Sequence, residues 1–180
     1  MRSKSLEISG GFCVLLAMML LLMPLQWLLA WLTAAAFHEL CHYAAIRLCG
    51  GDARSLAFYA DGAKMEMPTM SRSREVLCAL AGPVGGFALL LCAGWLPRVA
   101  LCGFIQSLYN LMPIYPLDGG RALYSGLLSI LPPPKAGLVC SILERVCKWA
   151  IWLCGVYGCF VLRIGVFPLL MAALLLIRTK

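Results

Sequence analysis

The two histidines of this 180-residue chain lie four residues apart, in the segment His38-Glu39-Leu40-Cys41-His42. Residues four apart share one face of a helix, so both imidazoles can bind a single zinc ion. Glu39 adjoins the first histidine and can take a proton from a water molecule that the metal activates. The motif therefore predicts metal-dependent hydrolysis. Because it lies within a long apolar stretch, we expect that chemistry to take place inside a membrane.

A catalytic zinc site needs a third protein ligand, and no further histidine is present to supply it. Among the eight acidic residues, Asp118 lies beside a predicted helix break in an apolar region. A carboxylate at membrane depth is unfavourable unless it has a partner. We therefore expect Asp118 to bind one zinc ion per chain together with His38 and His42. The alternative is a structural ion pair between Asp118 and Arg121.

Asn110 is the second candidate catalytic residue, and it precedes a segment that is interrupted by Pro113 and Pro116. Irregular backbone at membrane depth requires surrounding protein or a water-filled cavity. The Asn110 amide is suited to bind the substrate backbone or the oxyanion of a tetrahedral intermediate. The alternative is a polar contact at a helix end. Cys41 lies one step round the helix from both histidines, so we expect it to pack rather than to bind metal.

The composition predicts a polytopic membrane protein, because 62% of the residues are hydrophobic, 13% are charged and the mean hydropathy is +0.89. The net charge of +7 comes from residues that flank apolar runs or lie in one polar loop. This pattern places both termini and the loop in the cytoplasm and argues against nucleic-acid binding. The ten cysteines form no Cys-x-x-Cys pair, so we expect neither a disulfide framework nor a second metal site.

The predicted fold class is an all-α polytopic membrane protein with about six transmembrane helices, since about 20 apolar residues cross a bilayer. The predicted spans are residues 8–23, 27–48, 76–96 and 99–111, and two spans within residues 149–177. Residues 28–131 would form a three-helix catalytic core, and residues 135–177 the C-terminal helices of a single domain, 1–180. With the N-terminus inside, the second span returns to the cytoplasm, so the histidines lie in the cytoplasmic half of the membrane.

Three shorter features complete the prediction. Residues 122–131 are expected to form a helix that ends at three prolines, and residues 135–148 an amphipathic helix along the cytoplasmic interface. The polar loop, residues 50–73, contains two short strands, 55–59 and 63–67, which would form a β-hairpin at Asp61-Gly62; a disordered loop is the alternative. The edge of such a hairpin can bind a peptide as an added strand. Gly82 and Gly86 permit close approach of another helix.

Three motifs resemble, in this order, those of the site-2 protease family of intramembrane zinc metalloproteases. They are Phe37-His38-Glu39-Leu40-Cys41-His42, then Ala81-Gly82-Pro83, then Asn110-Leu111-Met112-Pro113-Ile114-Tyr115-Pro116-Leu117-Asp118-Gly119-Gly120-Arg121. The compact layout is similar to the bacterial branch that includes the protease activating a membrane-tethered sporulation sigma factor. The family often has an asparagine shortly after Ala-Gly-Pro, where this chain has Gly85-Gly86.

The resemblance implies that His38, His42 and Asp118 hold zinc and that Glu39 activates water. It implies cleavage of a membrane protein whose helix is locally unwound, with release of a cytoplasmic regulator from a bacterial cell membrane. It also implies that residues 50–73 present the substrate as a strand. We expect neither a PDZ domain nor a C-terminal nucleotide-sensing domain, so substrate selection would depend on the membrane core, the loop or a regulatory membrane protein.

Three hypotheses follow from the sequence. The leading one is an intramembrane zinc endopeptidase that acts on a membrane-embedded or membrane-associated protein. The alternative is a metal-binding membrane transporter or sensor, and the third is an inactive scaffold. Glu39 favours the endopeptidase, because a glutamate between the two ligands has a role in hydrolysis and no evident role in transport.

Overall fold

The computed structural model describes residues 6–8, 10, 17, 20–21, 23–51, 56–59, 62–65 and 70–160. The chain forms two compact units, Met1–Asn110 and Leu111–Lys180. The first unit carries the His-Glu motif and the second carries Asp118. The division falls within the predicted catalytic core, residues 28–131, and the assignment of one domain to residues 1–180 stays a prediction.

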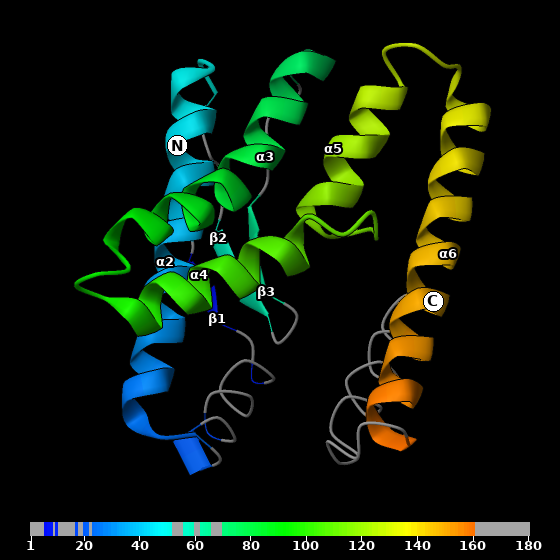
Figure 1. The fold of residues 1–180 in the computed structure, drawn as a ribbon. Coiled ribbons are helices and arrows are strands. Elements are labelled where there is room, and N and C mark those ends of the chain that lie inside the picture. Colours follow the sequence, from blue (N-terminus) through cyan, green and yellow to red (C-terminus); the bar gives the residue numbers. More distant parts are fainter. Residues whose placement is uncertain are drawn as a thin grey trace. The chain divides into compact units, whose positions relative to one another are not determined.

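Three helices of the first unit pack against one another. They are α2 (Leu25–Leu48), α3 (Arg72–Ala88, extended by the 3-10 helix η1, Leu89–Cys92) and α4 (Pro97–Asn110). Figure 1 shows α4 running across α2. Ala30, Ala34 and Cys102 form the buried core between these two helices, and such small side chains let helix backbones come close together. The helices predicted at residues 27–48, 76–96 and 99–111 are therefore confirmed, although their ends differ.

The turn before α4 differs from the prediction. The predicted spans 76–96 and 99–111 leave Pro97 and Arg98 between them as a turn, but Pro97 is the first residue of the helix. The backbone N–H groups of the first residues of a helix have no intrahelical acceptor. Proline suits this position because it has no backbone N–H group. The turn lies earlier, where the backbone N–H groups of Trp95 and Leu96 donate to the carbonyl of Cys92. Asn110 is the last residue of α4.

A three-stranded sheet also belongs to the first unit, with the order β1-β2-β3. Strands β2 (Leu56–Tyr59) and β3 (Gly62–Met65) are antiparallel, with Tyr59 opposite Gly62. The predicted hairpin is confirmed, but Gly62, which was expected in the turn, is the first residue of β3. Strand β1 (Leu6–Ile8) pairs in parallel with β2, with Leu6 opposite Leu56. The fold is thus helical with a small sheet.

This third strand corrects the start of the first predicted span, residues 8–23. Ile8 ends a strand and does not begin a helix. Most of residues 9–22 lie outside the described residues, so the rest of that span stays a prediction. Because β1 joins the hairpin on the β2 side, the open edges of the sheet are β1 and β3.

The second unit contains two helices that pack against each other, α5 (Asp118–Leu127) and α6 (Pro133–Phe160). The helix predicted at residues 122–131 is therefore shifted toward Asp118, since a carboxylate is favourable in the first turn of a helix. The boundary predicted between residues 148 and 149 is wrong, because α6 continues through it. The hydropathy changes there, but neither proline nor glycine interrupts the helix, and an ion pair between Glu144 and Lys148 supports it.

One helix among the described residues is long and apolar enough to cross a membrane. It covers Arg72–Cys92, 21 residues with a hydropathy of 1.9. The predicted number of six spans stays a prediction, and residues 161–177 of the last predicted stretch lie outside the described part of the chain.

Candidate metal centre

The two imidazoles of the motif face each other on α2. Their Nε2 atoms lie 3.1 Å apart, and the ring planes meet at 81°. Two imidazoles that bind one tetrahedral zinc ion, with zinc–nitrogen bonds of about 2.0–2.1 Å, place their nitrogens roughly 3.3 Å apart. His38 is buried, with 5% of its surface exposed, and His42 is half-buried. The spacing of the two nitrogens therefore fits a shared metal ion.

A backbone carbonyl of α3 fixes the protonation of His42. Its Nδ1 atom lies 2.7 Å from the carbonyl oxygen of Cys78. A carbonyl oxygen only accepts hydrogen bonds, so Nδ1 carries the proton and donates it. In the neutral ring, Nε2 then keeps its lone pair for a metal. A hydrogen bond of this kind also holds the ring in one orientation.

Gly82 lies one turn further along α3 and leaves open space at the two imidazole nitrogens. A Cβ atom added at Gly82 would lie 2.7 Å from Nε2 of His38 and still closer to Nε2 of His42. Real Cβ atoms essentially never come under 3.0 Å from another heavy atom. The absence of a side chain at residue 82 therefore leaves space in front of both Nε2 atoms.

The neighbouring glycines approach other parts of the helix cluster. A Cβ atom on Gly86 would lie 2.9 Å from the carbonyl oxygen of Gly103 on α4, and closer to the Ser107 hydroxyl. A Cβ atom on Gly85 would overlap the side chain of Cys41. The close helix approach predicted from Gly82 and Gly86 is confirmed, but Gly82 faces the histidines whereas Gly86 faces α4.

These contacts explain the departure from the family pattern at Gly85-Gly86. An asparagine at either position would overlap Cys41 or Ser107. Cys41 in turn fills the space beside Gly85, as expected of a packing side chain.

Asp118 is the first residue of α5, and 8% of its surface is exposed. Two glycines that follow it let the preceding loop lie directly on the first turn of the helix. A Cβ atom on Gly120 would lie 2.6 Å from the carbonyl oxygen of Ile114, and one on Gly119 would lie 2.7 Å from that of Met112. Gly119-Gly120 therefore allows the loop before α5 to pack against the helix that begins with the carboxylate.

His38 and His42 belong to the first unit and Asp118 to the second, and the assignment of these three potential ligands to one metal ion stays a prediction. Each offers one ligand atom. Glu39 is half-buried on α2, and Asn110 is half-buried at the end of α4. The catalytic roles predicted for Glu39 and Asn110 stay predictions.

Two features of the first unit escaped the sequence prediction. The carbonyl of Cys78 has no side-chain signal, because every residue has such a group. Gln106 on α4 is 7% exposed and donates a hydrogen bond of 3.0 Å to the carbonyl of Trp31 on α2. A glutamine in a largely apolar stretch could have indicated this contact, because a buried amide needs a hydrogen-bond partner.

Comparison with known proteins gives one informative result. No protein-family model matches the chain, and no curated protein matches it. Among solved structures, the chain is similar to the Site-2 Protease from Methanocaldococcus jannaschii, with a TM-score of 0.68 and 18% sequence identity. The match covers 94% of this chain and 86% of that one. The chain therefore shares the fold of a site-2 protease, which confirms at the level of fold the relationship predicted from the motifs.

Proposed function

We propose that this protein is an intramembrane zinc endopeptidase that hydrolyses a peptide bond in a membrane-embedded or membrane-associated protein. The observation that carries the proposal is the distance of 3.1 Å between the Nε2 atoms of His38 and His42, on the helix that also carries Glu39. The hydrogen bond from His42 to Cys78 leaves the metal-binding nitrogen unprotonated. The shared fold with a site-2 protease supports the same class of reaction.

The donor set fits zinc. Two neutral imidazoles and one carboxylate are a common ligand set of catalytic zinc sites, and they leave a fourth position open. We assign one zinc ion per chain to His38, His42 and Asp118. When bound, the ion lowers the pKa of a water molecule to near 7 and polarises the scissile carbonyl.

Glu39 is the general base in this proposal. Its carboxylate takes a proton from the attacking water as the water oxygen bonds to the carbonyl carbon. It then delivers that proton to the amide nitrogen as the carbon–nitrogen bond breaks, which releases an amine and a carboxylate. The side chain of Asn110 donates a hydrogen bond to the oxyanion of the intermediate. Asn110 thus stabilises charge, while Glu39 moves the proton.

The surface of the first unit supports a lipid environment. Large apolar side chains lie open on it, including Leu91 at 90% exposure and Trp95 at 88%. Both adjoin or belong to the stretch Arg72–Cys92, which is long and apolar enough to span a bilayer. An exposed apolar surface of this kind is unfavourable in water and suits lipid or a partner protein. We assign the protein to a bacterial cell membrane, with several spans and the active site toward the cytoplasm.

The sheet supports a mode of substrate binding. The edge strands β1 and β3 have backbone N–H and carbonyl groups directed away from β2, and an extended peptide can bind there as an added strand. A transmembrane helix must unwind to do so, and unwinding also exposes its scissile bond. We propose that the product is a cytoplasmic regulator and that a second membrane protein controls access.

The first experiment measures zinc and hydrolysis in the same samples of wild type, His38→Ala and Glu39→Gln. Zinc is measured by elemental analysis, and hydrolysis with fluorescently labelled casein in detergent micelles. We expect about one zinc per wild-type chain and loss of zinc in His38→Ala. Glu39→Gln has nearly the same shape and should keep its zinc, while hydrolysis falls by at least about 100-fold because the base is removed.

The other outcomes separate the alternatives. Equal loss of zinc in Glu39→Gln and His38→Ala would favour a metal transporter or sensor, because Glu39 would then act as a ligand. A folded and monodisperse wild-type protein without metal would favour the scaffold hypothesis.

A further inference from the structure

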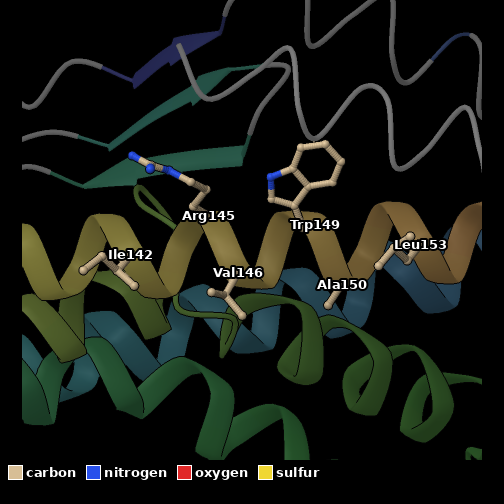
Figure 2. Close-up of a pocket in the computed structure, with 6 residues that line it drawn as sticks. All are labelled: Ile142, Arg145, Val146, Trp149, Ala150 and Leu153. Carbon is tan, nitrogen blue, oxygen red and sulfur yellow. The ribbon is translucent and has the colours of Figure 1, made fainter.

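A hollow of about 390 Å³ lies along one face of α6, in the second unit of the chain. Figure 2 shows the described residues that line it, which are Ile142, Arg145, Val146, Trp149, Ala150 and Leu153. They recur every three or four residues and so form one stripe along the helix. Four of the six are aliphatic, and Val146 and Leu153 are about 60% exposed. The groove is therefore an open apolar track with one cation beside it.

Arg145 and Trp149 supply hydrogen-bond donors along one side of this track. They lie four residues apart, and Figure 2 shows both side chains rising from the same side of α6. The indole nitrogen lies on the edge of the Trp149 ring that faces Arg145. A guanidinium and an indole N–H donate hydrogen bonds and accept none. The pair is consequently suited to an anionic oxygen.

The charges on this helix favour the same ligand. The ammonium of Lys148 pairs with the carboxylate of Glu144, one turn earlier. Arg145 belongs neither to this ion pair nor to the one between Arg72 and Glu75. Its positive charge therefore remains available to a ligand in the groove.

We propose that the α6 groove binds an anionic phospholipid. The headgroup phosphate accepts hydrogen bonds from Arg145 and Trp149, and an acyl chain lies along Val146, Ala150 and Leu153. A free phosphate would leave the apolar track open to water, and a zwitterionic lipid would bring no net negative charge to Arg145. This inference rests on the membrane location proposed above and is independent of hydrolysis. Tryptophan and arginine are also the residues that anchor helices at the headgroup level.

The test uses the full-length protein in nanodiscs of phosphatidylcholine and phosphatidylglycerol at four to one. After transfer to detergent, the retained lipids are counted by native mass spectrometry. We expect wild type to retain phosphatidylglycerol in excess of its share. Arg145→Gln should lower that retention about fivefold, the effect of one cation near a lipid surface. Trp149→Phe keeps the ring but removes the donor, and should lower retention about threefold to tenfold.

Lys148→Gln is the matched control, because it removes a cation from the same turn that is already paired with Glu144. Its retention of phosphatidylglycerol should equal that of wild type. Equal retention of both lipids by wild type, or an equal loss in Lys148→Gln and Arg145→Gln, would overturn the proposal. Displacement of the lipid by millimolar inorganic phosphate would also overturn it, since the site would then recognise a free anion. Zinc content, measured alongside, reports separately on the proposed function.

Discussion

Replacing Gly82 by alanine adds one methyl group at the centre of the proposed metal site. The new Cβ atom would lie 2.7 Å from Nε2 of His38 and 2.7 Å from Cδ2 of His42, with Nε2 of His42 closer still. Both rings belong to α2, whereas Gly82 belongs to α3. The substitution therefore acts on the ligands without changing a ligand.

The geometry sets the size of the effect. Ordinary van der Waals contact begins at 3.4 Å, so His38 and the new methyl group must separate by at least 0.7 Å, the difference between 3.4 and 2.7 Å. Metal–ligand distances tolerate only about 0.2 Å. Even residues that merely orient a ligand change metal affinity by 10–100-fold, so we expect Gly82→Ala to weaken zinc binding by about 100-fold, about 2.7 kcal/mol.

The assay is competition for zinc with a chelator of known affinity, supported by the absorption spectrum of the cobalt-substituted protein. Gly85→Ala is the matched control, because it lies on the same helix, is buried and meets Cys41 instead of the histidines. It should lower thermal stability but leave zinc affinity near that of wild type. Cys78→Ala is a second control, since it keeps the backbone carbonyl that holds His42.

The result that refutes this reasoning is specific. If folded Gly82→Ala protein bound zinc within about threefold of wild type, with an unchanged cobalt spectrum, α3 would not form a wall of the metal site. If Gly85→Ala lost zinc equally, the loss would reflect general disruption of the contact between α2 and α3.

Three further substitutions test other parts of the molecule. Asp118→Asn keeps the size of the side chain but removes its charge. It should lower zinc affinity by more than about 100-fold and reduce hydrolysis in parallel. Full zinc occupancy with normal cleavage would exclude Asp118 as a ligand. Gln106→Ala removes the buried hydrogen bond to Trp31 and leaves a cavity, so the free energy of unfolding should fall by about 2–3 kcal/mol while zinc per folded chain stays constant. The new methyl group of Gly86→Ala overlaps the Ser107 hydroxyl and should lower the free energy of unfolding by about 1–3 kcal/mol, as measured by thermal unfolding. If adding Ser107→Ala to this variant did not restore stability, that overlap would not be the cause.

Local features of the fold could be predicted from the sequence, because their determinants lie close together along the chain. The pairing of His38 with His42 follows from helical periodicity alone, and the hairpin could be predicted from the turn signal Asp61-Gly62, although Gly62 itself begins β3. Strand β1 could not be predicted in the same way. Its pairing joins Leu6 to Leu56, fifty residues later, and a three-residue strand has no periodicity of its own.

The course of α6 was mispredicted for a different reason. At Trp149 the residues become more apolar, and this change was taken as a boundary between an interfacial helix and a membrane span. Hydropathy decides what surrounds a helix, but backbone hydrogen bonding decides where the helix ends. No proline or glycine lies within five residues of Trp149, and the helix continues through that residue.

The proposed metal centre shows the same distinction at the level of single atoms. The proposed ligands are side chains, and their types and spacing could be identified directly. What α3 contributes is a carbonyl oxygen at Cys78, which every residue has, and a missing side chain at Gly82, which is the absence of an atom. These two residues are also four apart, so they lie on one face of α3 opposite the histidine pair on α2. The Ala-Gly-Pro motif therefore acts by bringing the backbone of α3 close to the histidines of α2. Only the packing of the two helices reveals that role.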